Sequence, residues 1–406
     1  MKIVVLKFGG TSVGTIEKIK KVTDIIIEHK KKKNKVIVVS SAMSGVTNDL
    51  IKKSKQISNN FIDSEYDVLV SSGEQVACSL IAGRLNHKGF KSRSWLGWQI
   101  PIFTNGPHTN SRIQQVNKNK LLRFLKEGGI PIITGFQGVN MNERVTTIGR
   151  GGSDASAIMI AKSFKAQRCI IYTDVEGVYT TDPNKLKKAK KIKVISYEEM
   201  LEMASLGAKV MQPVSIQDAR LNRINIEVKS SFIKKPGTLI TKRTNLNNNR
   251  IITGISSTHN DAKVTLVGVK DRPGVAASIF KPLSINSINV DMVVQNISPN
   301  GKETDLTFTI KAEDLNKTKK IIQENKSIKF KKVLFQKGVS KISIIGVGMI
   351  TTPGVTFRMF QTLANKKINI KVISTSEIKI SVLIDKKNTQ KALVALHNEF
   401  KLHQKK

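Results

Sequence analysis

Two glycine-rich segments with charged side chains are the parts of this sequence best suited to chemistry. Lys7 is followed closely by Gly9 and Gly10, a pattern in which backbone N–H groups and an ammonium group can approach an anion together. Arg150 stands between glycines, directly before an apolar segment at 155–164. A guanidinium group at the start of a helix suits a carboxylate ligand. Both segments therefore indicate that the protein binds anions.

Each segment also has a purely structural interpretation. Glycines after a strand often form a plain turn, and the sequence contains no complete P-loop motif. Ser153 or Asp154 suits the N-cap of the helix expected at 155–164. Two further passages rich in small residues, 40–47 and 72–74, are explained as well by turn chemistry. On these residues alone both interpretations stay open.

The elements that must position these residues follow from the pattern of apolar residues in the first part of the chain. Strands are expected at 3–8, 36–40, 130–135 and 169–174, and helices near 16–30, 66–85 and 155–164. Continuous apolar strands separated by helices predict a parallel sheet covered on both faces, an α/β core. Tyr172-Thr173-Asp174 ends one of these strands, and ligands bind at strand C-termini in open α/β sheets.

The last third of the chain is an internal repeat that follows an Asn-rich linker at 244–250. Pro273-Gly274-Val275 recurs 80 residues later as Pro353-Gly354-Val355, with other landmarks at the same offset. In the first copy strands are expected at 264–269, 289–297, 304–310 and 331–335, and helices from 274 and near 312–325. This βαββαβ order predicts a ferredoxin-like sandwich of about 70 residues in each copy.

Charge and cysteine content limit the partners and the compartment. The net charge is 68 − 30 = +38, which favours an anionic partner. Aromatic residues make up only 5%, and only 13 of the 68 basic residues are arginine, which argues against a nucleic-acid binder. Cys78 and Cys169 are far apart, and no segment is long and apolar enough for a membrane span or a signal peptide. A soluble cytoplasmic protein is therefore expected.

Five motifs, taken in order with the repeat, resemble the aspartate kinases nearly from end to end. The motifs are KFGGTSV, SSAMSGVTNDL, SSGEQ, IGRGGSDASA and YTDVEGVYTTDP. The resemblance implies an α/β amino-acid-kinase (carbamate-kinase-like) three-layer sandwich at 1–243, then a linker at 244–262. Two ferredoxin-like βαββαβ ACT domains would follow at 263–337 and 338–402. It also implies that a strand at 251–256 joins the second ACT domain.

The same resemblance implies an activity and a set of site residues. ATP would phosphorylate the β-carboxylate of L-aspartate to 4-phospho-L-aspartate, the first step of the lysine, threonine and methionine pathway. Lys7 would be catalytic, with Asp154 orienting it. The ATP-binding residues would be Lys7, Gly9, Gly10, Ser41, Thr173, Asp174, Tyr179 and Lys209. The aspartate-binding residues would be Thr47, Glu74, Phe136, Arg150 and Ser153.

Regulation is also implied by the resemblance. Lysine, threonine or both would bind the ACT domains and inhibit the enzyme, and the chain would form at least a homodimer through them. The effector residues would be Asp271, Asn289, Asp291, Gln295, Val355, Thr356, Asn369, Ile370, Ser376 and Glu377. Mg²⁺ would accompany ATP and be held mainly by its phosphates, so no metal ligands are assigned to the protein, and neither a specific nucleic acid nor a membrane is expected as a partner.

Three alternatives have distinct signatures. A kinase of glutamate or N-acetylglutamate would share the first domain, but the paired ACT domains and the KFGGTSV motif argue against it. An amino-acid sensor without activity would lack complete motifs. A basic nucleic-acid binder would be retained on DNA in a salt-dependent manner.

Overall fold

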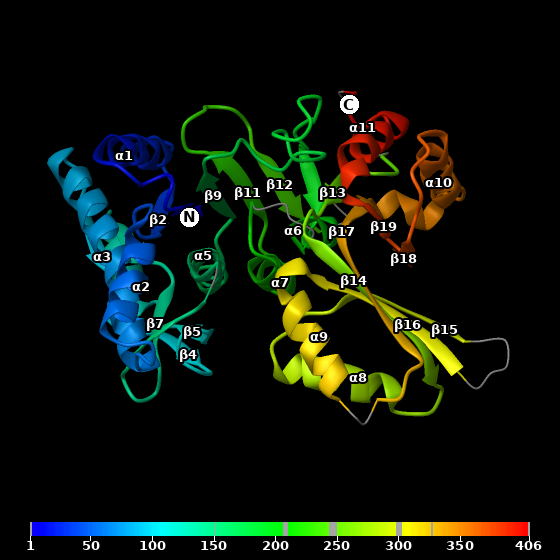
Figure 1. Ribbon diagram of the computed structural model, residues 1–406. Coiled ribbons are helices and arrows are strands. Elements are labelled where there is room, and N and C mark those ends of the chain that lie inside the picture. Colours follow the sequence, from blue (N-terminus) through cyan, green and yellow to red (C-terminus); the bar gives the residue numbers. More distant parts are fainter. Residues whose placement is uncertain are drawn as a thin grey trace. The chain divides into compact units, whose positions relative to one another are not determined.

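The computed structural model describes residues 2–149, 151–205, 210–242, 250–297, 303–325 and 328–404, which form two compact units (Figure 1). The first unit holds the described residues up to Tyr179 and again from Lys191 to Lys242. The second holds Thr180–Lys190 and the described residues from Arg250 onward.

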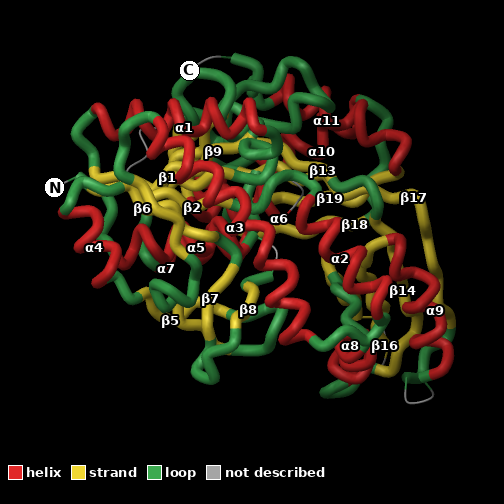
Figure 2. The backbone as a smooth tube through the Cα atoms, turned by 90° about the vertical axis from the view of Figure 1, so that its left-hand side faces the viewer, coloured by secondary structure: helices red, strands yellow, loops and turns green. Residues whose placement is uncertain are grey.

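The centre of the first unit is an eight-stranded sheet with the order β10-β12-β11-β9-β1-β2-β6-β3. These strands are β1 (Ile3–Phe8), β2 (Lys35–Ser40), β3 (Ser92–Trp95), β6 (Ile130–Thr134), β9 (Arg168–Thr173), β10 (Val194–Ser196), β11 (Ile226–Ser230) and β12 (Thr238–Thr241). All neighbours are parallel except β11 and β12. The strands β9, β1, β2 and β6 lie side by side in Figure 2. The α/β core predicted from the apolar runs is confirmed.

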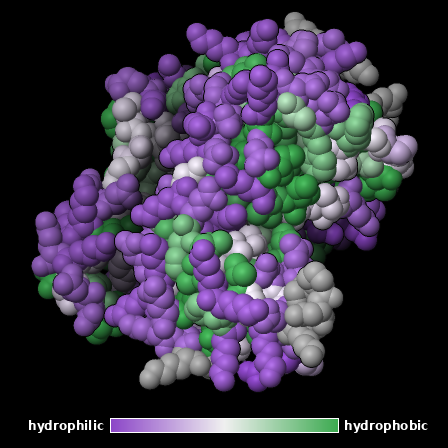
Figure 3. Space-filling model, turned by 45° about the vertical axis from the view of Figure 1, so that its right-hand side comes forward, coloured by the Kyte–Doolittle hydropathy of each residue, from purple (hydrophilic) through white to green (hydrophobic). Residues whose placement is uncertain are grey.

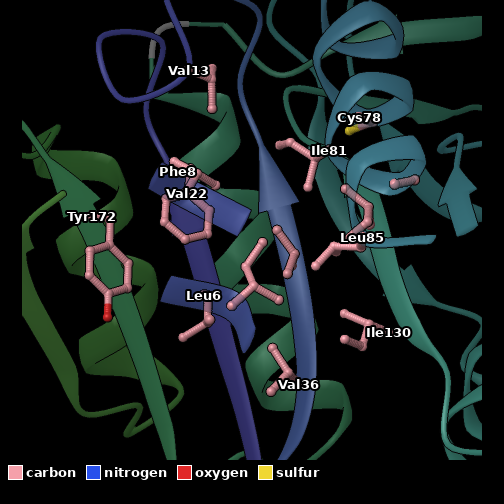
Figure 4. Close-up of a cluster of buried hydrophobic side chains, with 14 of the residues drawn as sticks. Leu6, Phe8, Val13, Val22, Val36, Cys78, Ile81, Leu85, Ile130 and Tyr172 are labelled. Atoms are coloured by element: carbon pink, nitrogen blue, oxygen red, sulfur yellow. The ribbon is translucent and has the colours of Figure 1, made fainter. Parts of the chain in front are cut away.

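Helices cover both faces of this sheet. They are α1 (Ile16–Lys31), α2 (Val46–Ile57), α3 (Asp63–His87), α4 (Asn119–Lys126), α5 (Gly152–Ser163), α6 (Tyr197–Ser205) and α7 (Pro213–Leu221). Leu6 and Phe8 of β1 pack in a buried cluster with Val22 of α1 and with Ile81 and Leu85 of α3 (Figure 4). Since side chains alternate along a strand, the residue between Leu6 and Phe8 points to the opposite face.

A second, four-stranded sheet in the first unit was not predicted from the sequence. Its order is β5-β4-β7-β8, formed by β4 (Ile102–Asn105), β5 (Arg112–Val116), β7 (Gln137–Val139) and β8 (Val145–Thr147). These strands have three to five residues each. Runs this short carry too little alternation to be recognised as strands.

The second unit contains one sheet that runs through both copies of the repeat, in the order β15-β16-β14-β17-β19-β18, with β13 paired to β17. The strands are β13 (Gly254–Ser257), β14 (Asp261–Lys270), β15 (Asp291–Ile297), β16 (Glu303–Lys311), β17 (Lys332–Ile345), β18 (Val372–Ser376) and β19 (Lys379–Asp385). The helices are α8 (Val275–Ile285), α9 (Leu315–Glu324), α10 (Val355–Asn365) and α11 (Thr389–Glu399).

Strand β17 belongs to both copies of the repeat. Its first half pairs with β14 and completes the first βαββαβ unit, while its second half pairs with β19 and β13. Each copy therefore has its own apolar core. The fourth strand of the second copy is β13, which precedes the first copy in sequence and pairs with β17, as the resemblance implied for residues 251–256. The repeat pattern alone places that strand after the last helix. Residues 400–404, which follow α11, form a turn.

The repeat is also visible in the backbone of corresponding turns. Gly274 and Gly354 have φ values of 86° and 84°, and each is the N-cap of an 11-residue helix. Ser287 and Lys367, again 80 residues apart, have φ values of 57° and 55°. Matching left-handed residues at the same offset show that the duplication preserved the geometry of the turns.

Residues Thr180–Lys190 pack in the second unit, although the chain on either side of them belongs to the first. The carbonyl of Thr180 accepts a hydrogen bond of 2.7 Å from the Ile255 N–H, and its hydroxyl lies 3.0 Å from Nε2 of the buried His397. The ammonium group of Lys185 donates to the Ser257 carbonyl at 3.3 Å. Residues 180–190 therefore pack with the second unit although they lie within the first unit in sequence.

The lysine excess lies largely on the surface. Hydrophilic side chains predominate on the face shown in Figure 3. Cys78 and Cys169 are both buried and free. No helix among the described residues combines the length and the apolar character needed to cross a lipid bilayer.

Candidate active site

Four parallel strands of the large sheet end at one edge, and the candidate residues follow those ends. Phe8 is in register with both Ser40 and Tyr172, and Ser40 is in register with Thr134. Backbone hydrogen bonds continue beyond the strands, because the Gly9 N–H donates to the Tyr172 carbonyl at 3.2 Å. Parallel pairing therefore brings together glycine-rich loops that are far apart in sequence.

An ion pair between Lys7 and Asp154 lies at this edge. The Lys7 ammonium nitrogen is 2.6 Å from Oδ1 of Asp154, and the two side chains are 11% and 9% exposed. Lys7 alternates with Leu6 and Phe8, so it points to the face on which α5 packs, and Asp154 lies in the first turn of α5. The pairing of these two residues implied by the resemblance is present in the structure.

Helix α5 begins earlier than expected and without a side-chain cap. Its N-cap is Gly151, with a left-handed φ of 80°, so neither Ser153 nor Asp154 has the N-cap role that the sequence allowed. A Cβ at residue 151 would lie 2.5 Å from the side chain of Gln212. Residues Gly152–Ala161 are all buried, and they include the polar side chains of Ser153, Asp154 and Ser156. Both Ser153 and Asp154 are thereby placed in the first turn.

The peptide of Ala42, in the loop after β2, connects the Lys7 loop to helix α3. Its N–H donates to Oε1 of Glu74 at 3.1 Å. Its carbonyl oxygen would be only 2.9 Å from a Cβ at Gly10, so that any side chain there would force the two loops apart. A Cβ at Gly73 of α3 would be equally close, at 2.9 Å from the Ala42 Cβ. Sequence reasoning missed Ala42 because it acts through its backbone, which no residue type reveals.

Glu74 is a buried acid with one unused oxygen. It is 3% exposed, and its Oε2 has no hydrogen-bond partner among the described residues. Burial raises the pKa of Glu74 from 4.5 to about 7, although the Ala42 N–H acts in the opposite direction. A buried carboxylate oxygen without a donor is costly unless a ligand supplies a cation or a hydrogen bond.

The loop after β6 lies against the start of α5. A Cβ at Gly135 would lie 2.7 Å from Ser153, and one at Gly152 would lie 2.8 Å from the ring of Phe136. Phe136 itself has a left-handed φ of 67°, and its N–H donates to the Ser156 hydroxyl at 3.2 Å. The structure thus brings Phe136 and Ser153, both candidates for substrate binding, onto neighbouring segments.

The remaining candidate residues are more exposed than Lys7, Asp154 and Glu74. Ser41 is half-buried, and its N–H donates to the Phe8 carbonyl at 3.0 Å, while Thr47 is half-buried in the first turn of α2. The Thr173 hydroxyl donates to the exposed Asp174 at 3.0 Å. Tyr179 is half-buried and is the last residue of the first unit before the chain enters the second unit at Thr180. Among the described residues, no hydrogen bond or ion pair joins the side chains of this group to Lys7 or Glu74. Two further candidates, Arg150 and Lys209, lie outside the described residues.

The candidate effector residues are found in the second unit. Seven of them are exposed, namely Asn289, Asp291, Gln295, Thr356, Asn369, Ser376 and Glu377. Asp271 and Ile370 are half-buried, whereas the side chain of Val355 is buried in the core of the second copy.

Asp291 is paired with the ammonium group of the buried Lys341 on β17. Burial raises the pKa of Asp291, but the hydrogen bond and charge of Lys341 outweigh it, so the pKa lies below its ordinary value.

Comparison with known proteins decides the family. A model of the amino acid kinase family matches residues 2–230, and an ACT domain model matches residues 264–325 and 342–400. An aspartokinase of Geobacillus stearothermophilus is 44% identical over 402 residues, which cover 99% of this chain and 98% of the relative. The chain belongs to the aspartokinase family. It is a kinase with an amino acid kinase domain followed by two ACT domains, as the motifs and the repeat predicted.

Two solved structures carry the same fold. Aspartokinase III of E. coli, in complex with aspartate and ADP, is 25% identical with a TM-score of 0.79 over 98% of this chain and 99% of its own. The same enzyme in complex with lysine and aspartate has a TM-score of 0.81 at 25% identity, over 98% of this chain and 100% of its own.

Proposed function

We propose that this enzyme transfers the γ-phosphoryl group of ATP to the β-carboxylate of L-aspartate. The product is 4-phospho-L-aspartate, which begins the synthesis of lysine, threonine and methionine. The name of the Geobacillus stearothermophilus relative and the E. coli structure with aspartate and ADP support this proposal. Oxygen of the carboxylate attacks the γ-phosphorus, and the bond to the β–γ bridging oxygen breaks, leaving ADP.

The observation that carries the choice of an amino acid is the unused oxygen of Glu74. A buried carboxylate oxygen without a donor fits an α-ammonium group, which donates up to three hydrogen bonds and carries the opposite charge. Ser153 lies in the first turn of α5, where helix N–H groups favour an anion, and fits a carboxylate of the same substrate. We assign Thr47, Phe136 and Arg150 to the same ligand.

The chemistry requires positive charge more than acid–base catalysis. The substrate carboxylate is already ionised at neutral pH, so no general base is needed. The barrier arises from bringing two anions together, and fixed cations and N–H groups lower it. Lys7, held at 2.6 Å by Asp154, provides such a charge next to the loop of Gly9 and Gly10, in which the Gly9 N–H already donates to the Tyr172 carbonyl. We assign Ser41, Thr173, Asp174, Tyr179 and Lys209 to the nucleotide.

Magnesium would enter with the nucleotide. The described residues contain no group of three or more His, Cys, Asp or Glu side chains arranged to hold a metal ion. Phosphate oxygens would be the main ligands of an ion that arrives with ATP.

The test is a substrate panel with the full-length enzyme. ADP release is measured with ATP and L-aspartate, L-glutamate or N-acetylglutamate, and hydroxylamine traps any acyl phosphate as a hydroxamate. We expect hydroxamate with aspartate alone. Hydroxamate formed with glutamate, or ATP hydrolysis without dependence on any amino acid, would contradict the proposal.

We further propose that lysine, threonine or both inhibit the enzyme by binding the ACT domains, in at least a dimer. The E. coli aspartokinase III structure with lysine supports lysine as one such effector. Asp291, an exposed residue of the edge strand β15 that faces the charge of Lys341, would bind the ammonium group of the effector. Titration of activity with each amino acid, alone and combined, tests this. A flat response in all three titrations would refute it, and Asp291→Asn should shift an existing response to higher effector concentration.

A further inference from the structure

A second buried acid on helix α3 has a different set of partners from Glu74. Asp67 is fully buried, and its carboxylate receives three donors from two other segments. Nδ1 of His108 lies 2.7 Å from Oδ2, and the Thr109 N–H donates to both oxygens at 3.1 and 3.0 Å. The hydroxyl of Thr147 also donates to Oδ1. None of these residues has a role in the proposed reaction.

These contacts connect three separate segments at one point. His108 and Thr109 belong to the loop between β4 and β5, and Thr147 is the last residue of β8. A buried carboxylate needs several donors to offset the loss of hydration, and its charge makes each hydrogen bond stronger. The loop and the end of β8 are therefore held on α3 by one side chain. The left-handed φ of Thr109, 66°, presents its N–H to the carboxylate.

The segments held by Asp67 lead directly to the candidate substrate residues. The Ser111 N–H donates to the Thr147 carbonyl at 2.9 Å. Two residues after Thr147, a Cβ at Gly149 would lie 2.9 Å from Oδ1 of Asn110. The Gly152 N–H, at the start of α5, donates to the Gly149 carbonyl at 3.1 Å. A short chain of contacts thus leads from Asp67 to the turn that contains Ser153.

The same helix also carries Glu74, seven residues after Asp67. Seven residues are about two helical turns, so both acids lie on one side of α3. We propose that Asp67 is a positioning residue for aspartate binding. By holding the β4–β5 loop and the end of β8 on α3, it sets where the turn with Ser153 lies relative to Glu74. This inference rests on the proposed function, because it assigns those two residues to opposite ends of the amino-acid substrate.

The experiment compares steady-state kinetics of full-length variants. Asp67→Ala should raise KM for aspartate about tenfold or more, because small displacements of binding groups have large effects. KM for ATP should stay within about twofold, since none of the hydrogen bonds that the described residues make to Asp67 comes from the loop after β1. Asp67→Asn keeps an oxygen that accepts the Thr109 N–H, and should restore most of the affinity for aspartate. Thr147→Val removes one donor at nearly constant volume and should raise KM for aspartate by a smaller factor.

A matched control separates positioning from general destabilisation. Glu199 is also a buried acid, and it accepts hydrogen bonds from the N–H and hydroxyl of Ser196 near the other end of the large sheet. Glu199→Ala should lower the unfolding midpoint without changing the ratio of the two KM values.

Equal changes in both KM values in the Asp67 and Thr147 variants would overturn the inference, as would unchanged KM values. Absence of aspartate-dependent activity in the unsubstituted enzyme would instead contradict the proposed function. If Asp67→Ala does not fold, Asp67→Asn and Thr147→Val carry the test.

Discussion

Glycines in the loops of the candidate active site differ from three left-handed glycines of the ACT unit in their physical reason to be glycine. In the kinase unit, a Cβ at Gly10 would lie 2.9 Å from the Ala42 carbonyl, and one at Gly135 would lie 2.7 Å from Ser153. In the ACT unit, Gly274, Gly338 and Gly354 have no atom within 4 Å of an added Cβ, but their φ values are 86°, 72° and 84°. The first set is required by contact between loops, and the second by backbone conformation.

This difference separates two ways of holding a loop. Loops at the edge of the large sheet press against one another, so that the positions of Lys7, Glu74 and Ser153 depend on mutual contact. At Gly274, Gly338 and Gly354 of the ACT unit there is open space beside the backbone, and the left-handed conformation alone requires glycine. Substitutions of the tightly packed active-site glycines should therefore change turnover and stability together, whereas substitutions of Gly274, Gly338 or Gly354 should change stability and leave basal turnover unchanged.

The largest expected effect is that of Lys7. Lys7→Ala should lower kcat by about 10³-fold or more, because it removes the fixed charge beside the transferred phosphoryl group. It also leaves Asp154 buried without its partner, which destabilises by about 3–5 kcal/mol for a fully buried pair. Steady-state kinetics and urea denaturation measure the two effects.

Two further variants separate charge from stability in that experiment. Lys7→Met with Asp154→Asn removes both charges at similar volume, so it should regain stability relative to Lys7→Ala while remaining inactive. Lys21→Ala, on the exposed face of α1, should behave like the unsubstituted enzyme. Turnover close to normal in either Lys7 variant would show that contact between the loops, without the lysine charge, suffices for the reaction.

The pH dependence of Glu74 gives the next largest effect. Between pH 4.5 and about 7 the folded enzyme keeps a proton on Glu74 that the unfolded chain has lost, so this group lowers stability as pH rises through that window. An α-ammonium ligand needs the ionised form. KM for aspartate should therefore fall as pH rises, by up to about tenfold per unit, and level off above about pH 7.

Glu74→Gln is the matching variant. It keeps an oxygen for the Ala42 N–H but loses the charge, so KM for aspartate should rise about 10–100-fold and no longer vary with pH. A pH profile of KM that is the same in both proteins would show that Glu74 does not meet the ammonium group.

Prediction from sequence succeeded where the information is local. The glycines after Lys7, the apolar strands of the sheet and the duplicated Pro-Gly turns could be recognised because each depends on neighbouring residues. The Lys7–Asp154 pair could be predicted only from the family resemblance, because 147 positions separate the two residues. Only the parallel pairing of β1 with β9 brings α5, which carries Asp154, close to Lys7.

What could not be predicted depends on backbone atoms or on long-range register. Ala42 supplies an N–H that any residue would supply, and the environment of Asp67 arises from a loop 41 residues away. The continuity of β17 through both repeats leaves no mark in either copy, because each half has the pattern of an ordinary strand. Short strands such as β7 and β8 owe their structure to neighbours and not to their own pattern.

Two glycine variants test the comparison between the units directly. Gly10→Ala must displace the Ala42 carbonyl, so it should lower kcat about tenfold or more, with a loss of stability of about 1–3 kcal/mol. Gly338→Ala in β17 meets open space and should lose only about 1–2 kcal/mol through its left-handed φ, with basal turnover unchanged. Kinetics and thermal unfolding of both proteins measure this. A loss of turnover in Gly338→Ala as large as that in Gly10→Ala would break the distinction.

The smallest effect is expected within α3, which contains both environments in one helix. Gly83 is exposed with no atom within 4 Å of an added Cβ, so Gly83→Ala should stabilise by about 0.5–1 kcal/mol through helix propensity. Gly73 has the same propensity to gain, but its Cβ would lie 2.9 Å from that of Ala42. Gly73→Ala should therefore destabilise, and because Ala42 donates to Glu74 it should also raise KM for aspartate. Urea denaturation of the two variants should give shifts of opposite sign. Equal shifts would mean that the Ala42 loop yields readily, and that contact between loops does not position Glu74.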